Sequence, residues 1–161
     1  MASWNENNDL IQGNKLNLYL TSGKTVVAYG TNASLQIDTE TVDTSSKFAC
    51  RWSSALGGKS NYTINSDSLY CSNEDGISFD TFIEMMVAGD QVEWYLGEEQ
   101  AWTGTCATNP HTLDTTKTYY NGSAIVSSCS LECGMDEAAT CSITLTGAGE
   151  ILKNNAQITG N

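Results

Sequence analysis

The sequence predicts a mainly β fold: two packed antiparallel sheets, as a β-sandwich or partial barrel, with one flanking α-helix at about residues 78–88. Several segments alternate apolar and polar residues with period 2, the pattern of strands with one buried and one solvated face. One segment changes to the helical period. A single proline, 14 glycines and a charged fraction of 16% are also typical of a protein built from strands and turns.

The N-terminal part predicts a flexible arm followed by a short hairpin. Residues 1–13 are polar, rich in Asn and without pattern, so we expect no structure of their own. Residues 15–20 alternate cleanly, residues 21–24 form a turn, and residues 25–29 supply a second strand. After the arm, we expect a single domain over residues 14–149.

A long hairpin is expected to organise the rest of the chain. In its first strand, Leu35 and Ile37 share one face, whereas Asp38 and Glu40 share the solvated face. The same alternation returns in residues 61–67, after a loop. Asp38 and Glu40 lack an apolar pocket that would raise a carboxyl pKa, so they are expected to be solvated acids rather than catalytic groups.

The loop of this hairpin, residues 46–58, is unusual. It is too long for a tight turn and too apolar for a purely solvated loop. Its Phe48, Trp52 and Leu56 must be buried somewhere, and a partner chain is a candidate to bury them.

The segment of helical period begins after a polar connector. Ser78 is placed to cap its N-terminus, and Gly89 follows its last turn. The expected packing face consists of apolar residues at positions i, i+3, i+4, i+7 and i+8, namely Phe79, Phe82, Ile83, Met86 and Val87. Because no second helix is expected, this face must pack on a sheet or cover a sheet edge.

The C-terminal part returns to period 2. A strand at residues 91–96 precedes a loop at 97–118, in which residues 101–103 are a candidate short strand. Residues 123–133 and 139–146 predict a terminal hairpin with one core face and one hydroxyl-rich face. On its first strand, the residues assigned to the core face are Ile125, Cys129, Leu131 and Cys133. Residues 150–161 are expected to be a polar tail.

The composition bounds the function. A net charge of −12, from 19 acidic and 7 basic side chains, argues against a surface that grips phosphate. No apolar run reaches the length of a membrane span, so a soluble protein is expected. The six cysteines follow no secretion signal, so we expect folding in a reducing cytoplasm.

No cofactor, metal or catalytic site is predicted. Cys129, Cys133 and Cys141 fall on the same inward parity, but the spacing C-x3-C-x7-C lacks a knuckle and a convincing fourth ligand. Buried free thiols are favoured, and a disulfide across the hairpin stays open. The single histidine, His111, lies in a loop and is expected to be an ordinary surface residue.

Four stretches, in order, resemble the major tail tube proteins of long-tailed bacteriophages. They are residues 26–46 (VVAYGTNASLQIDTETVDTSS), 52–69 (WSSALGGKSNYTINSDSL), 79–92 (FDTFIEMMVAGDQV) and 124–149, which ends in SITLTGAG. The most specific parts are the join after the helix, VAGDQV, and the entry to the second long strand, GGKSNY. The six cysteines and the Asn-rich arms match no pattern of that family.

This resemblance implies hexameric rings stacked into a hollow tube, with strands of six subunits joined in an inner barrel and DNA passing through the lumen. It implies an inter-ring arm at residues 46–58, with Lys47, Phe48, Arg51, Trp52 and Leu56 as contact residues. By strand parity alone, Asp38 and Glu40 are the candidates for acids that face the lumen. The implied partners are other copies of the chain, the tape measure, tail terminator and distal tail proteins. The implied location is the virion tail, assembled in the cytoplasm of a bacterial host, and no catalysis is implied.

Two alternatives stay open at this point. The tube of a contractile injection or secretion system shares the expected architecture. A carbohydrate-binding β-sandwich could instead present Trp4, Trp94, Trp102, Tyr119 and Tyr120 as rings on which sugars stack.

Overall fold

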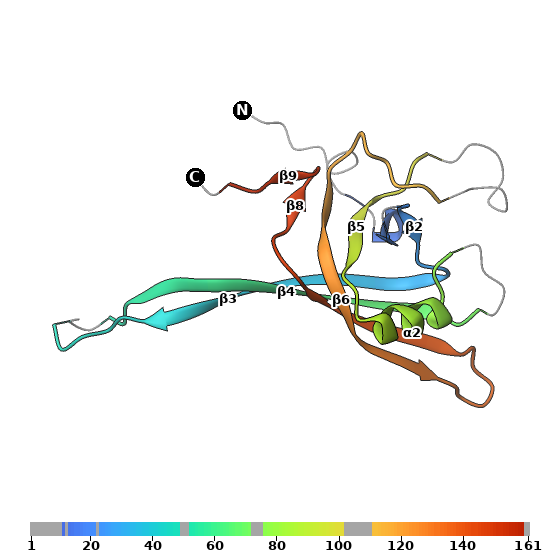
Figure 1. Cartoon of the computed structure of the whole chain (residues 1–161), viewed down its shortest axis with the longest axis horizontal. Helices are drawn as coiled ribbons and strands as arrows, with labels where there is room; N and C mark the ends of the chain where they lie inside the picture. The colour runs from blue at the N-terminus through green and yellow to red at the C-terminus, as the bar shows by residue number, and fades with distance from the viewer. Residues whose placement is uncertain are drawn as a thin grey trace.

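The computed structural model of the chain describes residues 11, 13–21, 23–48, 52–71, 76–101 and 111–159 (Figure 1). Most of the expected N-terminal arm, Arg51, Cys50, Cys106 and most of the candidate strand at 101–103 lie outside these residues. In chain order, the elements are η1 (Gly13–Lys15), β1 (Leu16–Leu20), β2 (Thr25–Val26), β3 (Gly30–Asp43), β4 (Ala55–Leu69), α2 (Phe79–Ala88), β5 (Val92–Glu98), β6 (Tyr119–Glu132), β7 (Thr140–Gly147), β8 (Leu152–Lys153) and β9 (Ala156–Gln157).

The expected fold class is confirmed, because the described chain is mainly antiparallel β with one helix. The strands belong to one continuous nine-stranded sheet rather than to two separate sheets. Seven strands follow the order β2-β1-β5-β6-β7-β4-β3, β8 pairs with β6, and β9 pairs with β8. The sheet is not closed into a barrel. It is curved enough to bring β1 into contact with β3, although they stand far apart in the strand order. Two layers of one sheet thus replace the two sheets that were predicted.

The core lies in the concave side of this sheet. Its fully buried side chains come from both layers and from the helix, and the largest include Trp94, Leu20, Phe82, Ile64 and Leu145. Leu18 and Leu96, at opposed positions of β1 and β5, extend the core along one layer. This arrangement follows from the period-2 pattern, since alternate residues of each strand face the same side.

Helix α2 forms where the helical period predicts it. Ser78 occupies the N-cap position without a side-chain capping hydrogen bond, and Gly89 ends the helix in the left-handed region, with φ 68°, its amide donating to the Met85 carbonyl. Glycine suits this position because a Cβ disfavours positive φ. Asp80 lies in the first turn, where a negative charge is favourable to the helix dipole.

The packing face of α2 is narrower than predicted. Phe82 is fully buried, and Phe79 and Met85 pack against the core, but Ile83, Met86 and Val87 are exposed. Positions 79, 82 and 85 follow one side of the helix, and the helix contacts β6. The rest of the apolar stripe therefore faces away from its own sheet, and Val87 is 82% exposed.

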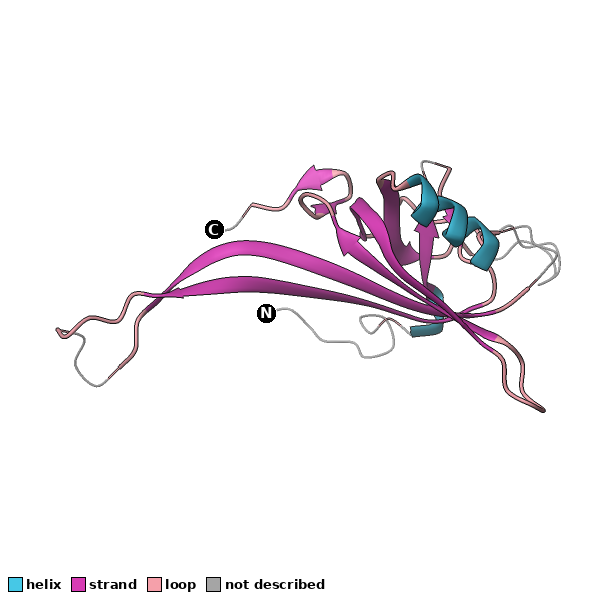
Figure 2. Ribbon diagram, turned by 60° about the horizontal axis from the view of Figure 1, so that its bottom comes forward, coloured by secondary structure: helices cyan, strands magenta, loops and turns pink. Residues whose placement is uncertain are grey.

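Strands β3 and β4 extend well beyond the body of the protein as a two-stranded arm (Figure 2). The strands are longer than expected and leave a connection of only residues 44–54, so the predicted loop 46–58 is partly strand. Leu56 belongs to β4 and pairs with Val42. Ile37, expected on a buried face, is exposed because both faces of the outer arm lie outside the body.

A β-bulge changes the face assignment of β6. The register shifts between Val126 and Ser128, so Val126 faces the core whereas Ile125 lies opposite Thr146 on the solvated face. Ile125 was predicted to share the face of Cys129, and this was wrong, because alternation counted back from Cys129 passes through the extra residue of the bulge.

The predicted C-terminal tail is also partly ordered. Strands β8 and β9 form a hairpin, and β8 pairs with Tyr120 and Asn121 of β6. Its two-residue turn, Asn154 and Asn155, has positive φ at both positions, 51° and 60°, which matches a type I′ turn. The Asn154 side chain accepts a hydrogen bond from the Tyr119 amide at 2.9 Å, which fixes the hairpin on the sheet.

Candidate functional site

Strands β6, β7, β4 and β3 form a four-stranded section with one solvated, polar face. Register places Asp67 opposite Ser142, and Asn65 opposite Thr144. The Ser142 hydroxyl donates to the Asp67 carboxylate at 2.7 Å, and the Thr144 hydroxyl donates to the Asn65 side-chain carbonyl at 3.0 Å. Side-chain hydrogen bonds across neighbouring strands thus stabilise a face that no part of the described chain covers.

The expected lumen-facing acids lie on this face by strand alternation. Asp38 is opposite Asn61 and its carboxylate accepts hydrogen bonds from the Gln36 amide at 3.2 and 3.1 Å. Asp38 and Glu40 are both exposed. Strands β3, β6 and β7 contain no Lys or Arg, and β4 contains only Lys59. The face is therefore polar and acidic.

Two strand edges of this section have no partner strand among the described residues. Strand β3 ends the strand order and pairs only with β4. Strand β6 pairs with β5 as far as Ala124, and on that edge no described strand continues beside residues 125–132. Long unpaired edges are templates for pairing with another chain. The sequence pattern could not reveal them, because it shows which residues form strands but not which edges stay free.

The tip of the arm carries large apolar side chains in solvent. Phe48 is 94% exposed, Trp52 83% and Leu56 64%. Lys47 is exposed beside them, whereas Arg51 lies outside the described residues. Exposed aromatic and aliphatic groups of this size are typical of interaction sites. The contact residues predicted from the resemblance that can be placed therefore lie together at the end of the arm, although Leu56 comes from a strand.

The base of the tip is held by local hydrogen bonds. Thr44 donates its amide to the Ser54 carbonyl at 2.8 Å, and their hydroxyls lie 2.7 Å apart. The Asp43 carboxylate accepts hydrogen bonds from Ser45, and these bonds lower the pKa of Asp43. The two strands thus stay paired up to the connection.

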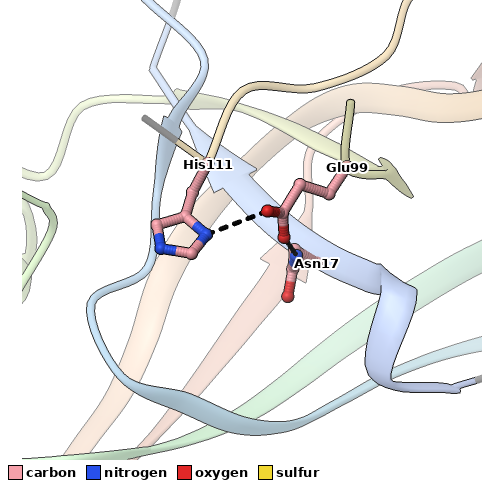
Figure 3. A network of polar contacts seen from close by, with 3 residues as sticks. All are labelled: Asn17, Glu99 and His111. Carbon is pink, nitrogen blue, oxygen red and sulfur yellow. Dashed lines mark hydrogen bonds and ion pairs between the residues drawn. The ribbon is translucent and has the colours of Figure 1, made fainter. Parts of the chain in front are cut away.

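His111 takes part in a structural network rather than standing alone (Figure 3). Its Nδ1 lies 3.0 Å from Glu99 Oε1, and the Asn17 amide donates to Glu99 Oε2 at 3.0 Å. Glu99 follows β5 and forms a bridge with Leu113. The shared carboxylate therefore joins the loop that contains His111 to β1 and β5.

Tyr19 lies buried on the same side of β1 as Asn17. Burial, and the nearby Glu99 charge to a smaller extent, raise the pKa of Tyr19 to about 12. Tyr19 packs with Tyr95, Leu113 and Tyr119 in a second core cluster. The buried Tyr19 ring therefore lies between this second core cluster and the polar contacts of Asn17 and Glu99.

The described residues contain no group of three or more His, Cys, Asp or Glu placed to hold a metal ion. Cys129 and Cys141 lie on the neighbouring strands β6 and β7 and pack in the core, and both thiols are free. Burial raises the pKa of Cys129 to about 11 and also raises the pKa of Cys141. The inward position of these two thiols agrees with the prediction, whereas Cys133 is exposed because it lies beyond the end of β6.

One hollow among the described residues lies between β1, β2 and the start of β3, with a volume of about 520 Å³. No titratable residue lines it. The hollow therefore offers no acid or base for catalysis.

The rings proposed for carbohydrate binding are not displayed together. Trp94 and Tyr119 are buried in the protein, and Tyr120 is partly exposed. Trp4 and Trp102 lie outside the described residues. A buried ring cannot stack on a sugar, so the described residues do not form the platform that this alternative requires.

No helix in the described chain is both long and apolar enough to cross a membrane.

No protein-family model matches the sequence, and a search of curated protein sequences finds no match. Solved structures do match. The tail of an empty gene transfer agent particle, with C6 symmetry, has a TM-score of 0.64 at 16% identity, covering 89% of this chain and 98% of that one. The SPP1 tail tube has a TM-score of 0.62 at 15% identity, covering 93% and 81%.

A third similar structure comes from the sheath-tube complex of an extracellular contractile injection system. Its TM-score is 0.58 at 11% identity, and the match covers 91% of this chain and 92% of that one. All three matches extend over most of the chain. The chain therefore has the tail-tube fold.

Proposed function

We propose that this chain is a structural, non-catalytic subunit that assembles into stacked hexameric rings, forming a tail tube through which DNA is delivered. The two free strand edges, on opposite sides of one four-stranded section, are the observation that carries this proposal. A contact between two different surfaces of identical subunits is heterologous, and it generates a ring when the rotation closes. The C6 symmetry of the similar gene transfer agent tail supports six copies.

The strand directions are compatible with such a ring. The pairs β6–β7, β7–β4 and β4–β3 are all antiparallel, so β3 and β6 run in opposite directions. A copy rotated about an axis along the strands places its β6 beside β3 of the first copy as another antiparallel pair. Each added copy repeats this junction, and the edges that invite aggregation in a single subunit are paired in the closed ring.

The polar face of the section is suited to line the lumen. Asp38 and Glu40 would then face the passing DNA, together with Asp67 and the hydroxyl rows of β7. The negative charges of the wall and of the duplex repel each other over about a Debye length, roughly 8 Å at physiological salt. This repulsion keeps the duplex from adhering to the wall. The inner face would thus conduct DNA without binding it specifically.

The further partners follow from the same proposal. We expect the subunit to assemble in the cytoplasm of a bacterial host and to meet tape measure, tail terminator and distal tail proteins in the virion. Residues 14–149 would form the assembling domain, with residues 1–13 and the end of the chain as appendages. The tube of a contractile system is the second candidate, supported by the similar sheath-tube structure. Purification of native particles with or without a sheath distinguishes the two.

The test is electron microscopy of the purified chain, over a range of concentrations and with a nucleating tail tip. Rings or tubes with a central hole are expected, and compact monomers under all conditions would contradict the proposal.

A matched pair of variants tests the edge itself. The Thr44 amide points to β4, so alternate residues of β3, including Ile37, turn their amides to the free edge. Ile37→Pro removes one outward donor, whereas Ile37→Ala keeps it. Ile37→Pro should fold, as judged by circular dichroism, but form no rings, and Ile37→Ala should form them. Equal ring formation by both variants would contradict pairing at this edge.

A further inference from the structure

We infer that the arm tip of one subunit docks on the end of a subunit in the next ring that carries α2 and the β6–β7 turn, through apolar and oppositely charged contacts. This inference rests on the proposed function, and it assigns the receptor for the arm. The receptor surface comprises α2 and the turn at residues 133–139.

The arm tip is basic. Residues 44–59 contain Lys47, Arg51 and Lys59, three of the 7 basic residues of the chain, and no acidic residue. Lys47 and Lys59 are exposed. In a chain with a net charge of −12, this segment is an exception to the overall acidity.

The receptor surface is acidic. The sequence has no Lys or Arg in residues 60–116 or 118–152, which include all of α2 and the β6–β7 turn. The acids exposed here are Asp80, Glu84, Asp136 and Glu137, and exposed Asp90 follows the end of α2. Opposite charges on two surfaces favour their encounter and penalise contacts between like surfaces. The arm tip is thus electrostatically matched to this end of another subunit.

The two surfaces also match in apolar character. Ile83, Met86 and Val87 form the part of the α2 stripe that its own sheet leaves exposed, and Met135 of the turn is 92% exposed. The arm tip presents Phe48, Trp52 and Leu56. Burying large side chains of this kind stabilises an interface by roughly 25 cal/mol per Å² of apolar area removed from water. Docking would cover both exposed sets at once.

The position of the surfaces requires that they belong to different subunits. Figures 1 and 2 show the arm tip at one end of the molecule, and α2 with the β6–β7 hairpin at the other. A chain cannot bring its arm tip to its own α2 without unfolding. Repeated contacts of this head-to-tail kind produce an open stack rather than a closed dimer.

Charge reversal tests the docking. Lys47→Glu and Glu84→Lys each place like charges at the contact, so each single variant should form rings but raise the concentration needed for tubes at least about tenfold. The double variant Lys47→Glu/Glu84→Lys should restore tube formation. Glu150→Lys, which makes the same change in net charge as Glu84→Lys but away from the receptor surface, is the control and should form tubes as the wild type does. Failure of the double variant to recover would count against this pairing.

Crosslinking identifies the receptor directly. A photoreactive benzoylphenylalanine at Trp52 should capture a peptide containing α2 or the β6–β7 turn from a second copy. Glu-C or Asp-N digestion is needed, because trypsin has no site between Lys59 and Lys117. If tubes form and the crosslinks map elsewhere, the docking inference is overturned while the tube proposal stands. If the wild-type chain forms neither rings nor tubes, the proposed function itself fails.

Discussion

Trp94 and Tyr62 join three strands through one hydroxyl group. The indole Nε1 of Trp94, in β5, donates to the Tyr62 hydroxyl at 3.2 Å, and this hydroxyl donates to the Ser123 carbonyl of β6. Their ring centroids are 5.5 Å apart, with the planes tilted by 59°. Tyr62 belongs to β4, so the contact bridges the two layers of the curved sheet at the base of the arm.

Tyr62→Phe should therefore destabilise the subunit. The variant keeps the ring but leaves the buried Trp94 N–H and the Ser123 carbonyl without this partner, which costs about 1 to 3 kcal/mol. Denaturant unfolding under conditions that keep the subunit monomeric measures the loss. Tyr29→Phe, at an exposed ring, is the control and should have little effect. Equal stability of Tyr62→Phe and wild type would show that the hydroxyl bridge contributes nothing.

Gly147 permits the close approach of the Tyr62 ring. A Cβ at Gly147 would lie 2.6 Å from the Tyr62 ring atoms Cε1 and Cζ, whereas a Cβ at Gly57 would meet nothing within 4 Å. Overpacking of a core typically costs about 1 to 3 kcal/mol. Gly147→Ala should lower the midpoint of denaturant unfolding, and Gly57→Ala should leave it nearly unchanged. A midpoint for Gly147→Ala at or above that of Gly57→Ala would contradict this packing.

The core of the fold was predictable from the sequence because its signals are local. The helical period over Phe79 and Phe82 and the alternation of Leu35 with Asp38 each come from neighbouring residues. The side of α2 that packs was not predictable, since Val87 and Phe79 share one apolar stripe and only tertiary position separates them. The bulge near Ser127 was not predictable either, because an extra residue in a strand leaves no distinctive composition in the sequence.

The candidate site was predicted unevenly. Phe48 and Trp52 were predicted to be contact residues because a long loop cannot easily bury large apolar side chains by itself, and both are exposed. The free edges of β3 and β6 depend on strand order, which one sequence does not specify. The pair Asn154 and Asn155 carried a usable signal, since asparagine tolerates positive φ and favours two-residue hairpins.

Replacing residues 45–53 with Asn-Gly should separate folding from stacking. Thr44 and Ser54 already pair at the end of the arm, and Asn-Gly suits a two-residue turn between paired strands. The variant should retain the circular dichroism and thermal unfolding of the wild type, because Phe48 and Trp52 make no part of the core. Electron microscopy should show rings without stacks. Tubes of normal length would mean that the arm tip has another task.

The thiols should react in a fixed order. Cys133 is exposed, whereas the raised pKa of Cys129, about 11, leaves only about one thiolate in a thousand at pH 8. Brief alkylation followed by peptide mass spectrometry should therefore modify Cys133 before Cys129 and Cys141.

The pH dependence of this labelling has a definite sign. Folding favours the protonated Cys129 thiol, so raising the pH from about 9 towards 11 should increase its labelling and lower the stability of the fold. Cys133→Ser serves as the control for peptide assignment. Labelling of Cys129 as fast as Cys133 at pH 8 would contradict its buried position.

The late arrival of β7 has a consequence for synthesis on the ribosome. Strand β4 ends at Leu69, but its second neighbour begins only at Thr140, and elongation at roughly 5 to 20 residues per second separates the two by about 4 to 14 seconds. During that interval, the nascent hairpin β3–β4 exposes both of its edges. Several chains growing on one messenger RNA would present identical hairpins with unpaired edges to each other. We therefore expect that ribosomes on the messenger are far apart, or that a chaperone covers the hairpin, until the last strands emerge.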